Sequence, residues 1–158
     1  DVEDAARRFY VAYEQLYGSS AIYKTIDHLS FNPPETANFT FRGNGLHWDV
    51  SLALPIPERY QGLLYLTDCH ADEGAFHCVP GFQNRIADWL GQLPPGADAR
   101  EVAVRELQLQ PVPGKAGDFV IWHQALPHCA TANRGKTVRI VQYLSYIPMN
   151  DVVQAVWV

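Results

Sequence analysis

The sequence predicts an all-β fold, a jelly roll with flanking α-helices, and two observations lead to this prediction. Short runs rich in Val, Ile, Tyr and Phe recur along the chain, and many of them alternate between apolar and polar residues, as half-buried strands do. Turn residues separate these runs, and only a few stretches have a helical repeat. Many short strands with few helices favour a sandwich or barrel, of which the jelly roll is one form.

The first element is a predicted amphipathic helix over residues 2–17. Apolar residues recur there at helical spacing, among them Phe9, Tyr13, Leu16 and Tyr17. The run Gly18-Ser19-Ser20 ends this pattern. Residues 21–36 carry little periodicity, and Pro33-Pro34 marks a loop within them. We therefore expect one flanking helix and a loop before the strands begin.

Strand patterns occupy most of the remaining chain. The candidate strands are 38–42, 50–54, 62–66, 74–79, 105–110, 118–122 and 137–146. A short helix is expected over 82–90, where apolar residues share one face, and turns are expected at 93–96 and 111–114. No repeat or second domain is visible, so we expect a single domain over residues 1–158.

Composition excludes several classes of protein. The chain of 158 residues is 47% apolar and can bury a core, and its net charge of −5 argues against a nucleic-acid partner. No apolar run approaches the roughly 20 residues that span a bilayer, and no signal peptide is visible. The three cysteines include no C-x-x-C pair, which favours reduced thiols. We expect a cytoplasmic protein without a membrane partner.

The tripeptide His47-Trp48-Asp49 is the first candidate for chemistry. On an extended chain, side chains alternate, so His47 and Asp49 would project to one side and Trp48 to the other, into packing. Taken alone, an H-x-D pair is more often an incidental surface turn. With one more histidine it becomes a set of two imidazoles and one carboxylate, which suits Fe(II) and leaves one face of the metal open.

His128 is the candidate for that further ligand. It follows a predicted strand and a turn, an arrangement that carries a side chain to a site on another strand. His123, at the end of the same strand, is the alternative, although it could also be a core histidine or one that orients a ligand. The neighbouring Cys129 suggests a Cys–His nucleophile only weakly, since adjacent residues on an extended chain point apart.

Arg139 is the fourth candidate, a lone cation within an apolar strand. A buried arginine is rare unless it is paired, so a partner is expected. That partner could be internal, such as Asp118, or it could be the far carboxylate of a bound 2-oxo acid, because a guanidinium binds a carboxylate through two parallel hydrogen bonds. Motifs of serine hydrolases, P-loops and dinucleotide-binding folds are missing from the sequence.

These residues resemble the phytanoyl-CoA dioxygenase family, within the iron- and 2-oxoglutarate-dependent oxygenases. The resemblance runs from about His47 to Tyr146, and three blocks carry it in order. They are His47-Trp48-Asp49, then Gly74 to Phe82 with its Pro80-Gly81, then Gly117-Asp118 with His128, Asn133 and Arg139. The step of eleven residues from His128 to Arg139 matches the family, which favours His128 over His123.

The resemblance implies a double-stranded β-helix, iron ligands and a cosubstrate. As implied, Fe(II) is bound by His47, Asp49 and His128, and 2-oxoglutarate by Arg139. The family often has serine two residues after the distal histidine, where this chain has Ala130, so we expect Thr131 to supply that contact. The segment before His47 is short for the family, so part of the usual N-terminal region is expected to be lacking.

The expected reaction is hydroxylation of a C–H bond in a small organic substrate, with O₂ as the other partner. The carboxylate of Asp49 favours hydroxylation over halogenation, since related halogenases lack this carboxylate. Two alternatives are a cupin-like metalloenzyme that does not use 2-oxoglutarate and a non-catalytic jelly-roll binding module. The first predicts that Arg139 pairs internally, and the second that His47 and His128 lie far apart.

Overall fold

A computed structural model describes residues 2–43 and 45–149 of the protein. In these ranges it contains three α-helices, α1 (Val2–Tyr17), α2 (Ile86–Gln92) and α3 (Ala99–Glu106), together with a 3₁₀ turn at Phe82–Asn84. Every strand pairing is antiparallel. The architecture is therefore mixed, with several antiparallel sheets and a larger helical share than the all-β prediction implied.

The strands form a major sheet, a minor sheet and a separate two-stranded pair. The major sheet has the order β2-β8-β3-β6, with bounds Leu29–Asn32, Arg139–Tyr143, Tyr60–Tyr65 and Phe119–His123. The minor sheet has the order β5-β4-β7, with bounds Gln110–Val112, Phe76–Cys78 and His128–Ala130. The pair joins β1 (Ile22–Lys24) to β9 (Tyr146–Pro148). Strands distant in sequence thus become neighbours.

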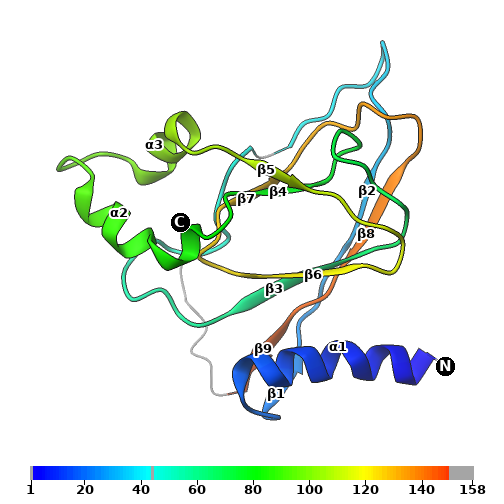
Figure 1. The fold of residues 1–158 in the computed structure, drawn as a ribbon, viewed down its shortest axis with the longest axis horizontal. Coiled ribbons are helices and arrows are strands. Elements are labelled where there is room, and N and C mark those ends of the chain that lie inside the picture. The colour runs from blue at the N-terminus through cyan, green and yellow to red at the C-terminus, as the bar shows by residue number, and fades with distance from the viewer. Residues whose placement is uncertain (1, 44, 150–158) are drawn as a thin grey trace.

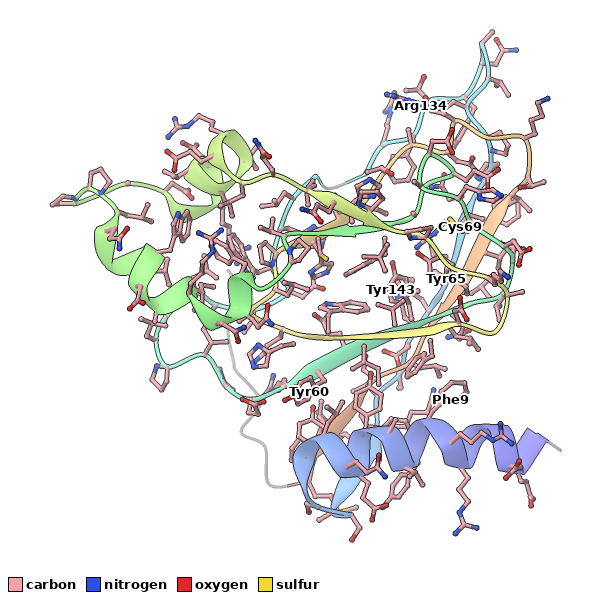
Figure 2. All side chains as sticks on the ribbon, viewed as in Figure 1. Phe9, Tyr60, Tyr65, Cys69, Arg134 and Tyr143 are labelled. Carbon is pink, nitrogen blue, oxygen red and sulfur yellow. The ribbon has the colours of Figure 1, made fainter. Side chains whose placement is uncertain are left out.

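The major and minor sheets face each other across a shared core (Figure 1). The ring of Phe76 on β4 lies 4.5 Å from that of Trp122 on β6, centroid to centroid. Tyr65 and Tyr143 of the major sheet also lie between the layers (Figure 2). Buried apolar side chains from both sheets belong to one cluster, so burial between the layers holds the sandwich together.

Helix α1 covers the outer face of the major sheet beside β3 and β6 (Figure 1). Phe9 packs edge-on against Phe119 with centroids 4.7 Å apart, and the Tyr13 hydroxyl donates to the Leu144 carbonyl at 2.7 Å. Gly62 on β3 permits this approach, because a Cβ there would lie 2.5 Å from the Tyr13 hydroxyl. The amphipathic pattern of residues 2–17 therefore reports a real packing face.

Most of the strand and helix predictions are confirmed, and three strand predictions are wrong. Segments 38–42 and 50–54 form no strand, and residues 21–36, which carry little periodicity, contain β1 and β2 before the predicted loop at Pro33-Pro34. Segment 105–110 falls across the end of α3 and the start of β5, which also takes in part of the predicted turn 111–114.

Each of these differences has its own physical cause. Residues 50–54 look apolar enough for a strand, but the Val50 carbonyl accepts from the Arg100 side chain at 2.8 Å instead of from a neighbouring strand. In 38–42, Phe39 bridges locally to Thr36. Strand β2 escapes notice because its apolar residues, Leu29 and Phe31, face outward and are more than half exposed. Its backbone pairs with β8, far along the chain.

The three cysteines, Cys69, Cys78 and Cys129, are unpaired and buried. Burial raises the pKa of the Cys129 thiol to about 11, so this thiol is protonated near neutral pH and is a poor nucleophile. None of the helices within residues 2–43 and 45–149 is long and apolar enough to cross a bilayer.

Candidate metal centre

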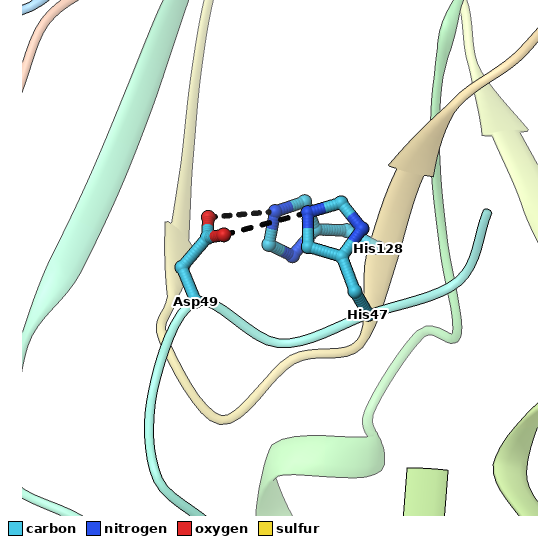
Figure 3. A group of neighbouring side chains, drawn as sticks. All are labelled: His47, Asp49 and His128. Atoms are coloured by element: carbon cyan, nitrogen blue, oxygen red, sulfur yellow. Dashed lines mark ion pairs between the residues drawn. The ribbon is translucent and has the colours of Figure 1, made fainter. Parts of the chain in front are cut away.

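The structure brings His47, Asp49 and His128 together (Figure 3). One ligand atom from each residue lies within 4.8 Å of the others. Asp49 stands between the imidazoles: its Oδ1 is 3.4 Å from His47 Nε2, and its Oδ2 is 3.3 Å from His128 Nε2. His123 is not part of this group, because its Nε2 lies 3.5 Å from a carboxylate oxygen of Glu58 instead.

A backbone bridge sets the spacing of the two histidines. The His47 amide donates to the His128 carbonyl at 3.0 Å, and the His128 amide donates back at the same distance. His128 begins β7 of the minor sheet, so this bridge ties the segment around His47 to the sheet edge. The two ring centroids are 4.7 Å apart as a result.

The orientation of each imidazole suits metal binding. His47 Nδ1 lies 2.8 Å from the Gly45 carbonyl, and His128 Nδ1 lies 3.0 Å from the Leu126 carbonyl. A carbonyl can only accept, so each Nδ1 must carry the proton and donate. In the neutral rings this leaves the lone pair on Nε2, the atom that faces Asp49, available to a cation.

The loop that carries Asp49 is held by side chains from elsewhere in the fold. Trp48 points away from the site into the core, as alternation predicts, and its indole N–H donates to the Ala125 carbonyl at 2.9 Å. Arg100 on α3 donates to the Trp48 carbonyl at 2.9 Å and to the Val50 carbonyl at 2.8 Å. The two carbonyls that flank Asp49 are therefore fixed by one guanidinium.

The charges at the site reinforce this arrangement. The hydrogen bond to Asp49 raises the pKa of His47, against the opposing effect of burial. Burial acts to raise the pKa of Asp49, but hydrogen bonds from His128, His47 and Gln61 outweigh it and hold that pKa well below its usual range. Asp49 is thus an anion at any physiological pH, as a metal ligand must be.

The cluster opens into a cavity of about 390 Å³ between the sheets, and Arg139 lines the same cavity. Only 1% of Arg139 is exposed, yet none of its guanidinium nitrogens has a hydrogen-bond partner within the part of the chain that the structure describes. Asp118, the predicted internal partner, accepts from the Lys115 amide instead. A buried, unpaired guanidinium is costly alone and fits an anionic ligand that would enter the cavity.

The family model for phytanoyl-CoA dioxygenase (PhyH) matches residues 6–141, most of the chain. The chain belongs to the phytanoyl-CoA dioxygenase family. The resemblance noted in the sequence is thereby confirmed, and with it the iron- and 2-oxoglutarate-dependent oxygenases as its wider group. A search among curated proteins found no match of significance.

Solved structures of similar fold agree with the family assignment. SnoN, a non-heme alpha ketoglutarate dependent epimerase from nogalamycin biosynthesis, shares 18% identity over 94% of this chain, with a TM-score of 0.66. AviO1 from Streptomyces viridochromogenes shares 20% over 92%, with a TM-score of 0.65. The carbocyclase SnoK, also from nogalamycin biosynthesis, shares 26% over 76%, with a TM-score of 0.56.

The chain spans 60%, 57% and 47% of SnoN, AviO1 and SnoK, respectively. One structure of SnoN holds Fe³⁺, alpha ketoglutarate and nogalamycin RO.

Ala130 stands where the family often has serine, and Thr131 follows it. Ala130 lines the cavity, whereas Thr131 does not appear in its lining. The Thr131 hydroxyl lies 3.5 Å from His77 Nδ1, and its carbonyl accepts from the Asn32 amide side chain at 3.0 Å. Thr131 as a cosubstrate contact remains a prediction from the sequence.

Asn133, fully buried, donates to two carbonyls and fixes the turn before Arg139.

Sequence reasoning missed three residues of this PhyH-family site. Gln61 donates to Asp49, Arg100 holds the loop through two hydrogen bonds, and His28, although exposed, lines the cavity with its ring 4.6 Å from that of Tyr143. A usable signal existed only for Gln61: it shares the inward face of its strand with Leu63 and Tyr65, where a polar residue is unexpected. Nothing local marks Arg100 or His28.

Proposed function

We propose that this protein is an Fe(II)- and 2-oxoglutarate-dependent dioxygenase that hydroxylates a C–H bond of a small organic substrate. The observation that carries the proposal is the unpaired guanidinium of Arg139 in the same cavity as His47, Asp49 and His128. A metal-ligand cluster alone would fit many metalloproteins. A buried cation beside it, without a partner of its own, points to a ligand with a free carboxylate.

The three ligand residues suit Fe(II) in their donor types and in the protonation states that their hydrogen bonds favour. Two imidazoles and one carboxylate with open positions form the donor set of non-haem Fe(II) oxygenases. The carbonyls of Gly45 and Leu126 fix the tautomers of the two histidines, and the low pKa of Asp49 keeps it ionised. When bound, iron and 2-oxoglutarate would supply the activation of O₂, with 2-oxoglutarate oxidised to succinate and CO₂.

Arg139 would bind the distal carboxylate of 2-oxoglutarate. It lies at the start of β8, whose backbone pairs with β2 on one side and β3 on the other, so its position is rigid. Tyr65 lies beside it, with the guanidinium carbon 5.9 Å from the ring centroid. The Thr131 hydroxyl is the proposed second contact, as the sequence predicts, and it would need to turn away from His77.

Phe76 and Trp122 give the cavity an apolar wall next to His128, with ring centroids 5.5 Å and 5.2 Å from the imidazole. Such walls exclude water from the reacting C–H bond. Halogenases have no carboxylate at this ligand position, whereas this chain has Asp49, and this difference supports hydroxylation. Since the similar structures include an epimerase and a carbocyclase, hydroxylation is our choice among the outcomes of this chemistry.

Two alternatives fit the observations less well. A cupin-like enzyme without 2-oxoglutarate would leave Arg139 to pair internally, and no internal partner is found within residues 2–43 and 45–149. A non-catalytic binding module would have no reason to converge its histidines, whose rings lie 4.7 Å apart. We also take the two facing sheets to be those of a double-stranded β-helix.

Turnover of 2-oxoglutarate tests the proposal. Wild-type protein with Fe(II), 2-oxoglutarate, ascorbate and O₂ should form succinate, slowly even without the primary substrate, and His128→Ala should form none above the background of free iron. His123→Ala is the matched control and should retain succinate formation. Succinate formation that survives in His128→Ala but not in His123→Ala would reject the ligand assignment.

A further inference from the structure

We propose that Gln61 is a positioning residue for the metal site: it fixes the orientation of the Asp49 carboxylate and is itself oriented by Trp122. The inference rests on the proposed function, since it concerns how the chain prepares Asp49 for a cation. Gln61 Nε2 donates to Asp49 Oδ2 at 2.8 Å, and Trp122 Nε1 donates to Gln61 Oε1 at 3.1 Å. The three side chains form one hydrogen-bonded line.

The sheet register creates this line. Gln61 on β3 and Trp122 on β6 are directly opposed in the antiparallel ladder, and both line the cavity. Opposed side chains on one face of a ladder lie within contact distance of each other. Trp122 is only 4% exposed and packs against Phe76 and His128. Its fixed position therefore determines where the Gln61 amide can lie.

The chemistry of the donors leaves one orientation for that amide. An indole N–H can only donate, so it must face the amide oxygen of Gln61. The amide nitrogen must then face Asp49, which as a carboxylate can only accept. Turning the amide over would place donor against donor at Trp122 and acceptor against acceptor at Asp49. The direction of the line is thus fixed by the residue types alone.

Asp49 is the ligand that most needs such support. The exposed fraction of its side chain is 38%, against 27% for His47 and 8% for His128. The His47 ring is held by the carbonyl of Gly45, and the His128 ring by the carbonyl of Leu126. If no side chain held it, the Asp49 carboxylate could rotate about its terminal bond. A hydrogen bond on Oδ2 restricts that rotation and keeps the carboxylate turned toward the two Nε2 atoms.

The hydrogen bonds from Trp122 to Gln61 and from Gln61 to Asp49 lead to a prediction that a purely structural role for Gln61 would not. Gln61→Met, which keeps the length of the side chain but donates nothing to Asp49, should weaken Co(II) binding by roughly 10- to 100-fold. Trp122→Phe, which frees the Gln61 amide to turn, should weaken it less. In Gln61→Met, the further change Trp122→Phe should have no added effect, because Trp122 acts through Gln61. Gln110→Met, on an exposed strand position, is the matched control.

The experiment is a Co(II) titration of metal-free protein, followed through the visible spectrum of the bound ion and through competition with a chelator. Thermal unfolding of each metal-free variant shows whether it is folded. The inference predicts weaker binding and an altered Co(II) spectrum in Gln61→Met at a temperature where thermal unfolding shows that this variant and Gln110→Met are both folded. The Trp122→Phe series tests it separately if Gln61→Met does not fold.

Two results would overturn the inference. Wild-type affinity and spectrum in a folded Gln61→Met would show that Asp49 needs no positioning, and additive losses in the double variant would show that Trp122 acts on the metal independently of Gln61. Both leave the proposed function standing. Wild-type protein that binds no Co(II) at all would overturn the proposed function instead, and this inference with it.

Discussion

The two halves of the site are built in different ways. His128 and Arg139 stand on strands whose backbones are paired within the sheets, and they are 6% and 1% exposed. Asp49 stands on a loop that lacks strand pairing, and His47 joins it to the sheet through one bridge. Side chains of Arg100, Gln61 and Trp48 take the place of the missing ladder.

Function and stability are separate on the strand half of the site and coincide on the loop half. On the strand half, the backbone is held whether or not the functional side chains are present, so those side chains are free to serve a ligand. On the loop half, the position of the ligand depends on side-chain hydrogen bonds, and a lost bond should affect both the fold and the metal. Mutations can separate these two cases.

The largest expected effect lies on the strand half. Arg139→Met should lower 2-oxoglutarate affinity by about 2–5 kcal/mol, the usual loss when a desolvated charged pair is broken. It should change the stability of the metal-free protein little, because none of the guanidinium nitrogens has a hydrogen-bond partner to lose within the described chain, and the contact with the Tyr65 ring is long. Calorimetric titration with 2-oxoglutarate and thermal unfolding measure the two quantities. Unchanged cosubstrate affinity would remove the cofactor assignment.

On the loop half, Arg100→Met should affect stability and metal affinity together. It removes two hydrogen bonds from a charged donor to the carbonyls beside Asp49, for a loss of about 2–3 kcal/mol in the free energy of unfolding. Urea unfolding and Co(II) titration check both losses. Arg105→Met, at an exposed position of the same helix, is the control and should change neither. Full metal affinity in a destabilised Arg100→Met would mean that the clamp holds the fold but not the ligand.

Trp48→Phe should give a smaller loss on the same half. The ring still packs against Phe82 and Trp89, but the hydrogen bond to the Ala125 carbonyl is lost. One such bond contributes about 1 kcal/mol, so urea unfolding should show a loss of that size, and the loss of metal affinity should be smaller than in Arg100→Met. A loss as large as that in Arg100→Met would show that the indole, and not the arginine, is the main anchor.

The smallest expected effect is a pH dependence of the metal-free protein. His47 has a raised pKa, so its pairing with Asp49 stabilises the fold below the ordinary histidine pKa of about 6.5, and this contribution is lost as pH rises through the pKa of the folded state. Asp49, with a lowered pKa, contributes above about pH 3.9, and its contribution is lost as pH falls through its folded pKa. The pair therefore stabilises most between these limits.

NMR titration of the histidine ring protons would show this directly. The pKa of His47 should lie above the ordinary value in wild type and fall in Asp49→Asn. A His47 pKa that is equal in the two proteins would mean that the carboxylate does not act on this ring.

Sequence reasoning succeeded on the residues whose surroundings are local and failed on those whose partners are distant. The apolar strand around Arg139 predicted its burial, and the H-x-D pair together with the family-like step of eleven residues from His128 to Arg139 pointed to the three residues that the structure brings together. Alternation also placed Trp48 in the core, although the segment is a loop and not a strand. Arg100 escaped because its role depends on carbonyls some fifty residues earlier, which helix α3 reaches only in the folded chain.

Helix α3 itself carried a start signal that could have been used. Asp98 caps it by accepting from the Arg100 and Glu101 amides, and an aspartate at that place is a common helix start. The strand-like alternation of 105–110 hid the helix end. Strands β1 and β2 had no such signal, since their backbones pair with β9 and β8, which lie far along the chain.

The most direct test of the central claim is the joint binding of metal and cosubstrate in the absence of O₂. Fe(II) and 2-oxoglutarate added together to wild-type protein should give the weak visible charge-transfer band of the chelate, and neither alone should do so. His128→Ala should show no band, and Arg139→Met should need a much higher concentration of 2-oxoglutarate. Wild-type protein without the band, or an undiminished band in His128→Ala, would contradict the account.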